Sequence, residues 1–232
     1  MTQTTMNLAE IFETVPSDLA AYFEQIADGS LSEHEKYELN LLPVSDAVRW
    51  TKDFLDFHPV VSFFRGVVLD DPNTSNHHVY LSETCCSGAV FYLNHDGDSQ
   101  IVFPTLEAFL DAARRASNTS QNLSAFHPDT GVQLADQKGL SELITGILDG
   151  EFACDCDGVV VALVPSLDLT DVTLLGRLVN DDDFYIAAAV GDAIARRPRS
   201  DLAAVAETCQ RHKHFQAAKA GARALAAIAS LK

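Results

Sequence analysis

The alternation of apolar and polar positions is clearest between Gly88 and Ala116. Residues 89–94 are apolar on both faces, which is typical of a strand inside a sheet, and residues 101–103 predict a partner strand. The intervening residues 95–98, His-Asp-Gly-Asp, have the composition of a hairpin turn, because Asp-Gly readily takes the positive backbone angles that such turns need. Thr105 is positioned to cap a helix, so the pattern predicts strand, turn, strand and helix in succession. The apolar face of this helix consists of Leu106, Phe109, Leu110 and Ala113.

Three helices and two weaker strands are predicted before this unit. Apolar residues recur at helical spacing in the ranges 8–15, 17–29 and 45–57. The range 60–69 predicts a strand interrupted near Gly66, and the range 78–81 predicts a further short strand. Between these two strands, the Asp-Asp-Pro-Asn sequence of residues 70–73 predicts a turn.

The rest of the chain is predicted to be helical apart from one strand. Residues 140–148 have helical spacing, whereas residues 158–164, Gly-Val-Val-Val-Ala-Leu-Val, are typical of a strand in a sheet interior. Further helices are predicted at 171–179, 184–196, 201–211 and 214–230, the last of them rich in alanine. The pattern therefore predicts an α+β domain over residues 1–165 and an all-α C-terminal extension over residues 166–232.

Composition places the chain among ordinary globular proteins. Its 232 residues are 47% apolar, which suffices for a substantial core. No apolar run approaches the ~18 residues that a membrane span needs, and the N-terminal residues lack the basic start and apolar core of a signal peptide. The five cysteines, with Cys85 and Cys86 adjacent, do not have the spacing of a secreted disulfide framework. We therefore expect a cytoplasmic protein with reduced thiols and no membrane partner.

The charge is strongly acidic and unevenly distributed. The formal net charge is −17. Residues 1–195 hold 8 Lys and Arg against 31 Asp and Glu, whereas residues 196–232 hold 8 against 2. This balance argues against nucleic acid as the main ligand, since most of the protein would repel phosphates. It suits a basic protein partner, whose association an acidic surface accelerates, although solubility alone is the simpler explanation of such a surface.

Familiar catalytic and metal-binding motifs are absent from the sequence. It contains no Gly-x-Ser-x-Gly elbow, Walker loop, dinucleotide fingerprint or His-Glu-x-x-His. His34-Glu35-x-x-Glu38 lacks the second histidine of the last motif and is interpreted as a polar loop. A zinc site of two sulfurs and two nitrogens is conceivable, but its Cys-x-Cys and His-x-His spacings are tighter than usual. Its ligands would be Cys154, Cys156, His212 and His214. We therefore expect no metal and no other cofactor.

Two further clusters leave alternatives open. Cys85 and Cys86 are either a vicinal thiol sensor or semi-buried small hydrophobic residues beside a strand, and the second interpretation is favoured. The His-His pair at residues 77–78 lies close in sequence to Asp70 and Asp71. These histidines could titrate or bind metal weakly, but a hydrated turn explains them equally well.

The stretch from Val60 to Ala116 resembles the SUKH superfamily. The shared pattern is an apolar strand after a glycine, a His-Asp-Gly turn, a short return strand and a capped helix. It is carried by Gly88-Ala89-Val90-Phe91-Tyr92-Leu93, His95-Asp96-Gly97, Ile101-Val102 and Thr105-Leu106-Glu107-Ala108-Phe109-Leu110, and the resemblance covers about a quarter of the chain. It implies an antiparallel sheet with flanking helices. It also implies a protein-binding module without known catalysis, as in many bacterial toxin-immunity proteins and a yeast regulator of cell-wall synthesis.

We therefore predict a SUKH-like α+β fold and a non-catalytic binding protein whose partner is basic, such as a toxin domain. The candidate contacts are carboxylates expected in exposed turns around the hairpin: Asp70, Asp71, Glu83, Asp96 and Asp98. The alternative is a hydrolase or metal-dependent enzyme that uses the Asp, His and Cys side chains between residues 70 and 98. The missing catalytic motifs favour binding.

Overall fold

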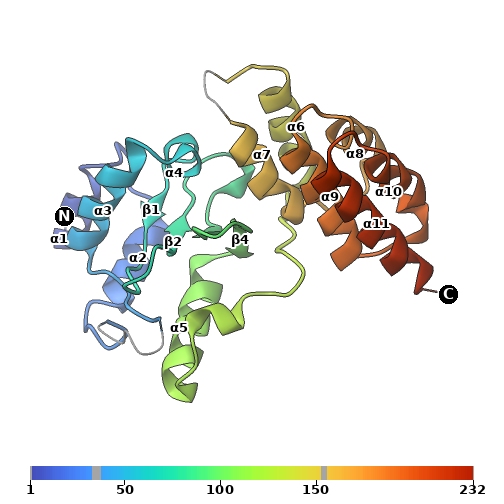
Figure 1. The fold of residues 1–232 in the computed structure, drawn as a ribbon. Helices are drawn as coiled ribbons and strands as arrows, with labels where there is room; N and C mark the ends of the chain where they lie inside the picture. Colours follow the sequence, from blue (N-terminus) through green and yellow to red (C-terminus); the bar gives the residue numbers. More distant parts are fainter. Residues whose placement is uncertain (1, 33–37, 153–155, 232) are drawn as a thin grey trace. The chain divides into compact units, whose positions relative to one another are not determined.

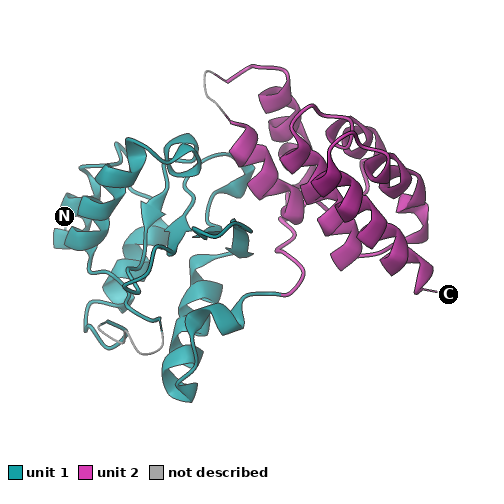
Figure 2. Ribbon diagram, viewed as in Figure 1, with its two compact units in different colours: residues 1–128 teal, residues 129–232 magenta. Residues whose placement is uncertain are grey.

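The chain folds as two units in the computed structural model, with the division between Pro128 and Asp129 (Figures 1 and 2). We refer to residues 1–128 as unit 1 and to residues 129–232 as unit 2. The structure describes residues 2–32, 38–152 and 156–231. The division falls earlier than the boundary after residue 165 that the hydrophobic pattern predicts, so the segment before that boundary belongs with the helical C-terminal part.

Unit 1 is built on a four-stranded antiparallel sheet with the strand order β1-β2-β3-β4. Its strands are β1 (Val67–Val68), β2 (His77–Tyr80), β3 (Val90–Leu93) and β4 (Gln100–Phe103). Strands that follow each other in the chain are neighbours in the sheet, so successive connections alternate between its two ends. In the turn between β3 and β4, Gly97 and Asp98 have φ angles of +105° and +58°. The predicted hairpin is therefore confirmed.

Helices pack on both faces of this sheet. The helices of unit 1 are α1 (Gln3–Leu8), α2 (Ser17–Gln25), α3 (Val44–Leu55), α4 (Pro59–Phe63) and α5 (Leu106–Thr119). On one face, the His77 ring lies 5.5 Å from the Trp50 ring of α3. On the other, the His78 ring lies 5.0 Å from the Phe109 ring of α5. Adjacent strand residues point to opposite faces of the sheet. Since helices cover both faces, β2 lies in the middle layer of three, and all four of its residues are buried.

Helix α5 confirms the predicted cap and core face. The Thr105 hydroxyl oxygen accepts a hydrogen bond from the backbone N–H of Ala108 at 3.1 Å, which satisfies one of the unpaired donors at the helix start. Its buried residues include all the predicted core positions, Leu106, Phe109, Leu110 and Ala113. Phe109 is 0% exposed, so this helix covers the sheet as the sequence predicts.

The segment before β1 differs from its prediction. The sequence predicts an interrupted strand over residues 60–69, but Pro59 begins the short helix α4, since proline favours the first helical position. Gly66 then lets the chain pass close to β2, because a Cβ at this position would lie 2.6 Å from Cγ1 of Val79. Only the two residues of β1 remain paired in the sheet.

Unit 2 contains helices and no strand among its described residues. They are α6 (Gln137–Leu148), α7 (Asp157–Leu163), α8 (Val172–Leu178), α9 (Phe184–Arg196), α10 (Ala203–Gln210) and α11 (Phe215–Ala229). The predicted strand at residues 158–164 is wrong, because this run forms α7, with Val159, Val160 and Leu163 buried. A short apolar run fits a buried strand or a buried helix equally well, and the neighbouring helices decide between them.

Small residues let α9, α10 and α11 approach each other closely. A Cβ on Gly191 of α9 would lie 2.8 Å from the Cβ of Ala220 in α11. A Cβ on Gly221 of α11 would overlap the backbone of Cys209 and Gln210 in α10. The small side chains of the alanine-rich last helix therefore permit close packing.

Together these elements give an α+β fold in which helices flank an antiparallel sheet, as predicted. Among the described residues, no helix is both long enough and apolar enough to cross a membrane.

Candidate functional site

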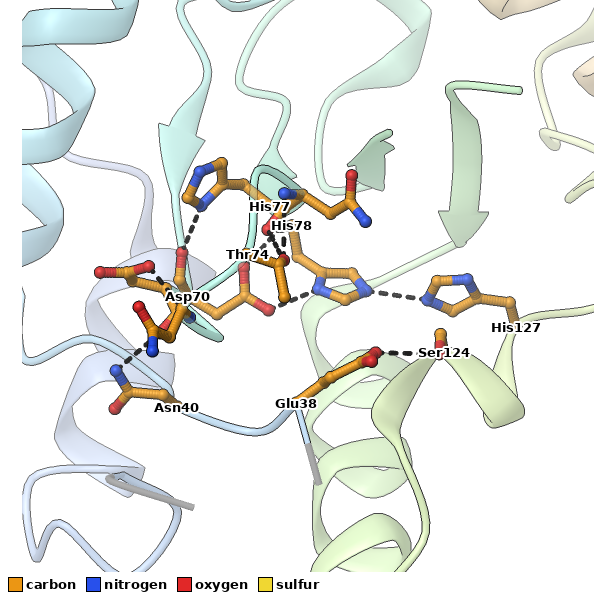
Figure 3. Close-up of polar contacts among 11 residues, drawn as sticks. Glu38, Asn40, Asp70, Thr74, His77, His78, Ser124 and His127 are labelled. Carbon is orange, nitrogen blue, oxygen red and sulfur yellow. Dashed lines mark hydrogen bonds and ion pairs between the residues drawn. The ribbon is translucent and has the colours of Figure 1, made fainter. Parts of the chain in front are cut away.

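The most unusual polar group in unit 1 is the buried carboxylate of Asp70. Asp70 follows β1, where Leu41 forms an isolated antiparallel bridge with it, and it is 0% exposed. Its Oδ1 accepts a hydrogen bond from the backbone N–H of His78 at 2.6 Å, and its Oδ2 lies 2.5 Å from Nδ1 of His78 (Figure 3). One residue of β2 therefore satisfies both carboxylate oxygens.

His78 extends this contact to a second histidine. It is 3% exposed, and its Nε2 lies 2.8 Å from Nε2 of His127 (Figure 3). Because a carboxylate accepts hydrogen bonds, we assign the proton on Nδ1 of His78 as the donor of the hydrogen bond to Asp70. Between the two Nε2 atoms, one ring donates and the other accepts. We call Asp70, His78 and His127 the Asp-His-His network.

Aromatic rings enclose this network. The His78 ring centroid lies 5.0 Å from the centroids of Tyr92 and Phe109. The His127 ring lies 4.6 Å from Tyr92 and 5.6 Å from Phe103. The rings keep the imidazoles in an apolar environment, which strengthens hydrogen bonds between them and makes an unpaired polar group costly.

His77 holds the same aspartate from the opposite face of the sheet. Its Nδ1 lies 3.0 Å from the backbone carbonyl oxygen of Asp70. Its ring lies 5.5 Å from that of Trp50 and 5.1 Å from that of Phe54, both in α3. The adjacent histidines of β2 thus fix Asp70 through its backbone on one face and its carboxylate on the other.

Burial shifts the pKa of His127 and of two tyrosines near the network. Burial, and to a smaller extent the neighbouring His78, lower the pKa of His127 to about 3, so this imidazole is neutral at neutral pH. Burial, with the negative charges of Glu38 and Asp70, raises the pKa of Tyr92. Burial and Asp70 also raise the pKa of Tyr22, whose buried hydroxyl has no hydrogen-bond partner among the described residues. The Asp70 charge therefore acts across the core of unit 1.

Two further contacts connect remote segments around the network (Figure 3). The Asn40 side-chain amide donates to the backbone oxygen of Asp71 at 2.7 Å. The Ser124 hydroxyl donates to Oε2 of Glu38 at 3.5 Å. Ser124 belongs to the short 3-10 turn Leu123–Phe126 that directly precedes His127. His127 and Ser124 thus attach the last segment of unit 1 to His78 of β2 and to Glu38, while Asn40 holds the backbone of Asp71.

The chemistry open to this arrangement is the holding or transfer of a proton. An Asp–His pair can orient an imidazole and stabilise its protonated form. Here the second nitrogen of His78 meets another imidazole, and among the described residues no Ser, Thr or Cys side chain hydrogen-bonds to either ring. No three His, Cys, Asp or Glu side chains in the described part of the chain are grouped so as to hold a metal ion.

The predicted contact residues do not form one group. Asp70 is buried, so the prediction that its carboxylate is exposed in a turn is wrong. The reason is that β1 ends two residues before it, which places Asp70 beside β2 in the core. Glu83 lies in the connection between β2 and β3, at the other end of the sheet from the connection that carries Asp71, and 3.6 Å from Arg65.

Three of the predicted carboxylates do lie at one end of the sheet. Asp71 is in the connection between β1 and β2, and Asp96 and Asp98 are in the connection between β3 and β4. These connections meet where the backbone N–H of His95 donates to Oδ1 of Asn76 at 2.8 Å. Asp96 and Asp98 are exposed and Asp71 is half-buried. We call this group the acidic loop end.

One of the four residues considered as zinc ligands cannot bind zinc as a thiolate. Cys156 is disulfide-bonded, contrary to the expectation of reduced thiols, and so offers no thiolate. His212 has other partners, since its Nδ1 accepts from the backbone N–H of His214 at 3.0 Å and its Nε2 lies 3.2 Å from a backbone oxygen. Cys154 lies outside the described residues, as does His34-Glu35 of the near-miss motif.

Sequence reasoning missed His127 and misjudged the His-His pair. His127 follows a weakly patterned segment and is 49 residues from His78, so no local signal connects them. A signal did exist for residues 77–78. Adjacent side chains in a strand point to opposite faces, and a buried imidazole on each face needs its own hydrogen-bond partner. The carboxylates of Asp70 and Asp71 were the nearest candidates in the sequence.

Comparison with known proteins identifies no relative: no family model, no curated protein and no solved structure matches this chain significantly.

Proposed function

We propose that this protein is a non-catalytic binding protein of the SUKH type, and that it acts as an immunity protein by neutralising a basic partner such as a bacterial toxin domain. The observation that carries the proposal is the acidic loop end, where two hairpin connections bring Asp71, Asp96 and Asp98 to one end of the sheet. Carboxylates on loops held by a sheet are well placed to contact a partner.

The distribution of charge supports a cationic partner for unit 1. Unit 1 carries 18 Asp and Glu against 6 Lys and Arg, a balance of −12. Unit 2 carries 15 against 10, a balance of −5. A field of this sign raises the association rate of a basic protein and orients its approach, whereas it repels phosphates.

The Asp-His-His network supports the proposal because it helps to fix the connection between β1 and β2, which carries Asp71. Both oxygens of Asp70 and both nitrogens of His78 are engaged inside the unit. Asp71 is the next residue, and its backbone N–H and carbonyl both bond to Asn40. The connection between β1 and β2 is therefore held firmly, and a loop that is already ordered loses less entropy on binding.

The test measures whether this protein binds a toxin domain encoded by a neighbouring gene and protects cells against that toxin. Co-expression of this protein should restore growth, and the purified pair should associate more slowly as salt shortens the screening length below about 10 Å. The double variant Asp96→Asn/Asp98→Asn should lower the association rate by about tenfold at low salt. Glu13→Gln/Glu24→Gln removes the same charge from exposed positions of unit 1 outside the loops and is the matched control.

Two results would contradict this proposal. An association rate that does not change with salt would remove the electrostatic argument. A control variant that slows association as much as the loop variant would show that net charge matters and the acidic loop end does not.

One observation favours a second candidate function, a hydrolase in unit 1. The Asp-His-His network ends in His127, a partly buried imidazole that is neutral at neutral pH and so has the protonation state of a general base, although its lowered pKa makes it a weak one. Cys85 and Cys86 lie beyond the C-terminal end of β2 and are not part of the Asp-His-His network.

This second candidate is tested with panels of ester and phosphate-ester substrates. A hydrolase should show turnover that is lost in both His78→Gln and His127→Gln but kept in His95→Gln, which changes an exposed histidine of the hairpin turn. Such a result would overturn the non-catalytic proposal. Equal background rates in all four proteins would exclude this use of the network.

A further inference from the structure

A pair of adjacent thiols lies in the connection between β2 and β3. Cys85 and Cys86 end the short 3-10 turn Thr84–Cys86, and their Sγ atoms are 3.9 Å apart. Cys86 is 0% exposed, whereas Cys85 is partly exposed. The two sulfurs are therefore close enough to react with each other after a small movement, and only one of them meets solvent.

The turn that carries the thiols is held in an unusual conformation. Thr84 has a φ of +65°, which is rare for a β-branched residue and costs energy. The backbone N–H of Ser87 donates to the carbonyl of Thr84 at 3.2 Å, and that of Ala89 donates to the carbonyl of Cys86 at 3.1 Å. The turn thus holds the two thiols next to a strained backbone position.

The two sulfurs differ in reactivity. The hydrogen bond with Cys85, followed by burial, raises the pKa of the Cys86 thiol, so Cys86 keeps its proton. Nucleophilic attack requires a thiolate that an external reagent can reach. Cys85 is therefore the attacking group, and Cys86 is the resolving group behind it.

We propose that Cys85 and Cys86 form a modification site for small-molecule disulfides of the glutathione type. The Cys85 thiolate attacks one sulfur of the reagent, forms a mixed disulfide and releases one small thiolate. In the mixed disulfide, Cys85 no longer holds the proton on Cys86, so Cys86 releases its proton and attacks Sγ of Cys85, which forms the Cys85–Cys86 bond and releases the second small thiolate. The protein loses two electrons, which reduce the reagent to two thiols.

The product should be easy to reduce again. The Cα atoms of adjacent residues are about 3.8 Å apart across a trans peptide, whereas ordinary disulfides join Cα atoms ~4.4–6.8 Å apart. A disulfide between neighbours is therefore strained, and strained disulfides belong to the labile group that can serve regulation. Ser87 and Gly88, which follow the pair, line a groove of about 400 Å³ between α2 and α5, so closure of the disulfide alters one wall of that groove.

The test treats the full chain with oxidised glutathione and follows it by intact mass and peptide mapping. The wild type should lose two thiols at this site and retain no glutathione, and excess reduced glutathione should restore both. Cys86→Ser should stop at a stable glutathione adduct on Cys85. Cys85→Ser should react at Cys86 at least about tenfold more slowly, because that thiol is buried. Cys209→Ser, a change at a buried thiol of unit 2, is the control and should behave as the wild type.

Two results would overturn the assignment. One is a wild-type protein that keeps glutathione as its final product, because Cys86 would then not resolve the adduct. The other is a Cys85→Ser protein that reacts as fast as the wild type. Should a variant fail to fold, timed alkylation of the native wild type decides the order, since Cys85 must be labelled well before Cys86.

Discussion

The two units build their cores from different kinds of side chain. Among the described residues, every buried aromatic side chain lies in unit 1, whereas Phe152, Tyr185 and Phe215 of unit 2 are exposed by 38%, 57% and 74%. Unit 1 also buries a threonine, an aspartate and two histidines, whereas the described part of unit 2 has one buried polar residue, Ser166. Unit 1 therefore depends on satisfying buried polar groups, and unit 2 depends on how closely its helices approach.

This contrast follows from the geometry of the two layers. A sheet covered on both faces leaves room between strand and helix that large rings fill, and His77 and His78 occupy opposite sides of it. Helices packed as closely as α9, α10 and α11 have no such room, and glycine and alanine are the residues that fit. The units should therefore fail for different reasons.

The largest expected effect is that of Asp70→Ala. The change leaves the backbone N–H and Nδ1 of His78 without their acceptor in the core, and breaking a buried pair in this way typically costs about 3–5 kcal/mol. Hydrogen exchange of the full chain should show lost protection in β2 and β3 but not in α9 and α11. Equal protection in wild type and variant would mean that Asp70 does not hold unit 1 together.

A smaller effect is expected from Gly221→Ala in unit 2. The added Cβ would overlap the backbone of Cys209 and Gln210, and overpacking of this kind typically costs about 1–3 kcal/mol. Gly176→Ala is the matched control, because apart from its chain neighbours and the backbone of its own helix no atom lies within 4 Å of the added Cβ. That change should stabilise α8 by about 0.5–1 kcal/mol, since glycine weakens a helix interior. Equal destabilisation by both changes, measured by denaturant unfolding, would refute close approach as the reason for Gly221.

Acid should weaken unit 1 through His127. The pKa of His127 is lowered from 6.5 to about 3 in the folded state, so the unfolded chain binds more protons between these values. Stability is therefore lost as pH falls through this window, by at most about 1.4 kcal/mol per pH unit for one proton. His127→Gln should flatten this dependence, whereas His95→Gln, an exposed change, should not. The measurement is the denaturation midpoint between pH 7 and pH 4. If the midpoint of His127→Gln changed with pH as steeply as that of the wild type, His127 would not be the cause of this pH dependence.

The smallest effect is expected from Asp96→Ala in the hairpin turn. Its side chain is exposed, and surface changes of this kind usually alter stability by less than about 0.5 kcal/mol. The variant should melt like the wild type while its association with a basic partner slows. A large loss of stability would show that Asp96 has a structural role in the turn, which would weaken its place in the acidic loop end.

Local chemistry explains what could be predicted. The glycine in the His-Asp-Gly-Asp sequence marks the turn between β3 and β4, although the positive φ angles fall on Gly97 and Asp98 and not on Asp96. Thr105 specifies the start of α5, and the spacing of apolar residues specifies its buried face. Each of these signals involves only a few neighbouring residues, so each element can be predicted from the sequence alone. The exposure of Asp96 and Asp98 follows from the same turn, so predicting it needed no tertiary information.

Only the tertiary structure decided the features that depend on distant neighbours. The strand predicted at residues 158–164 is the helix α7, because the surroundings of an apolar run choose its conformation. Asp70 is buried and not exposed, because β2 offers it a backbone donor and an imidazole on the same face. The sequence by itself determined the hairpin, the capped helix and the acidic balance, since these are local or additive properties. The Asp-His-His network joins residues 70, 78 and 127, and their meeting is a consequence of the fold that no spacing along the chain encodes.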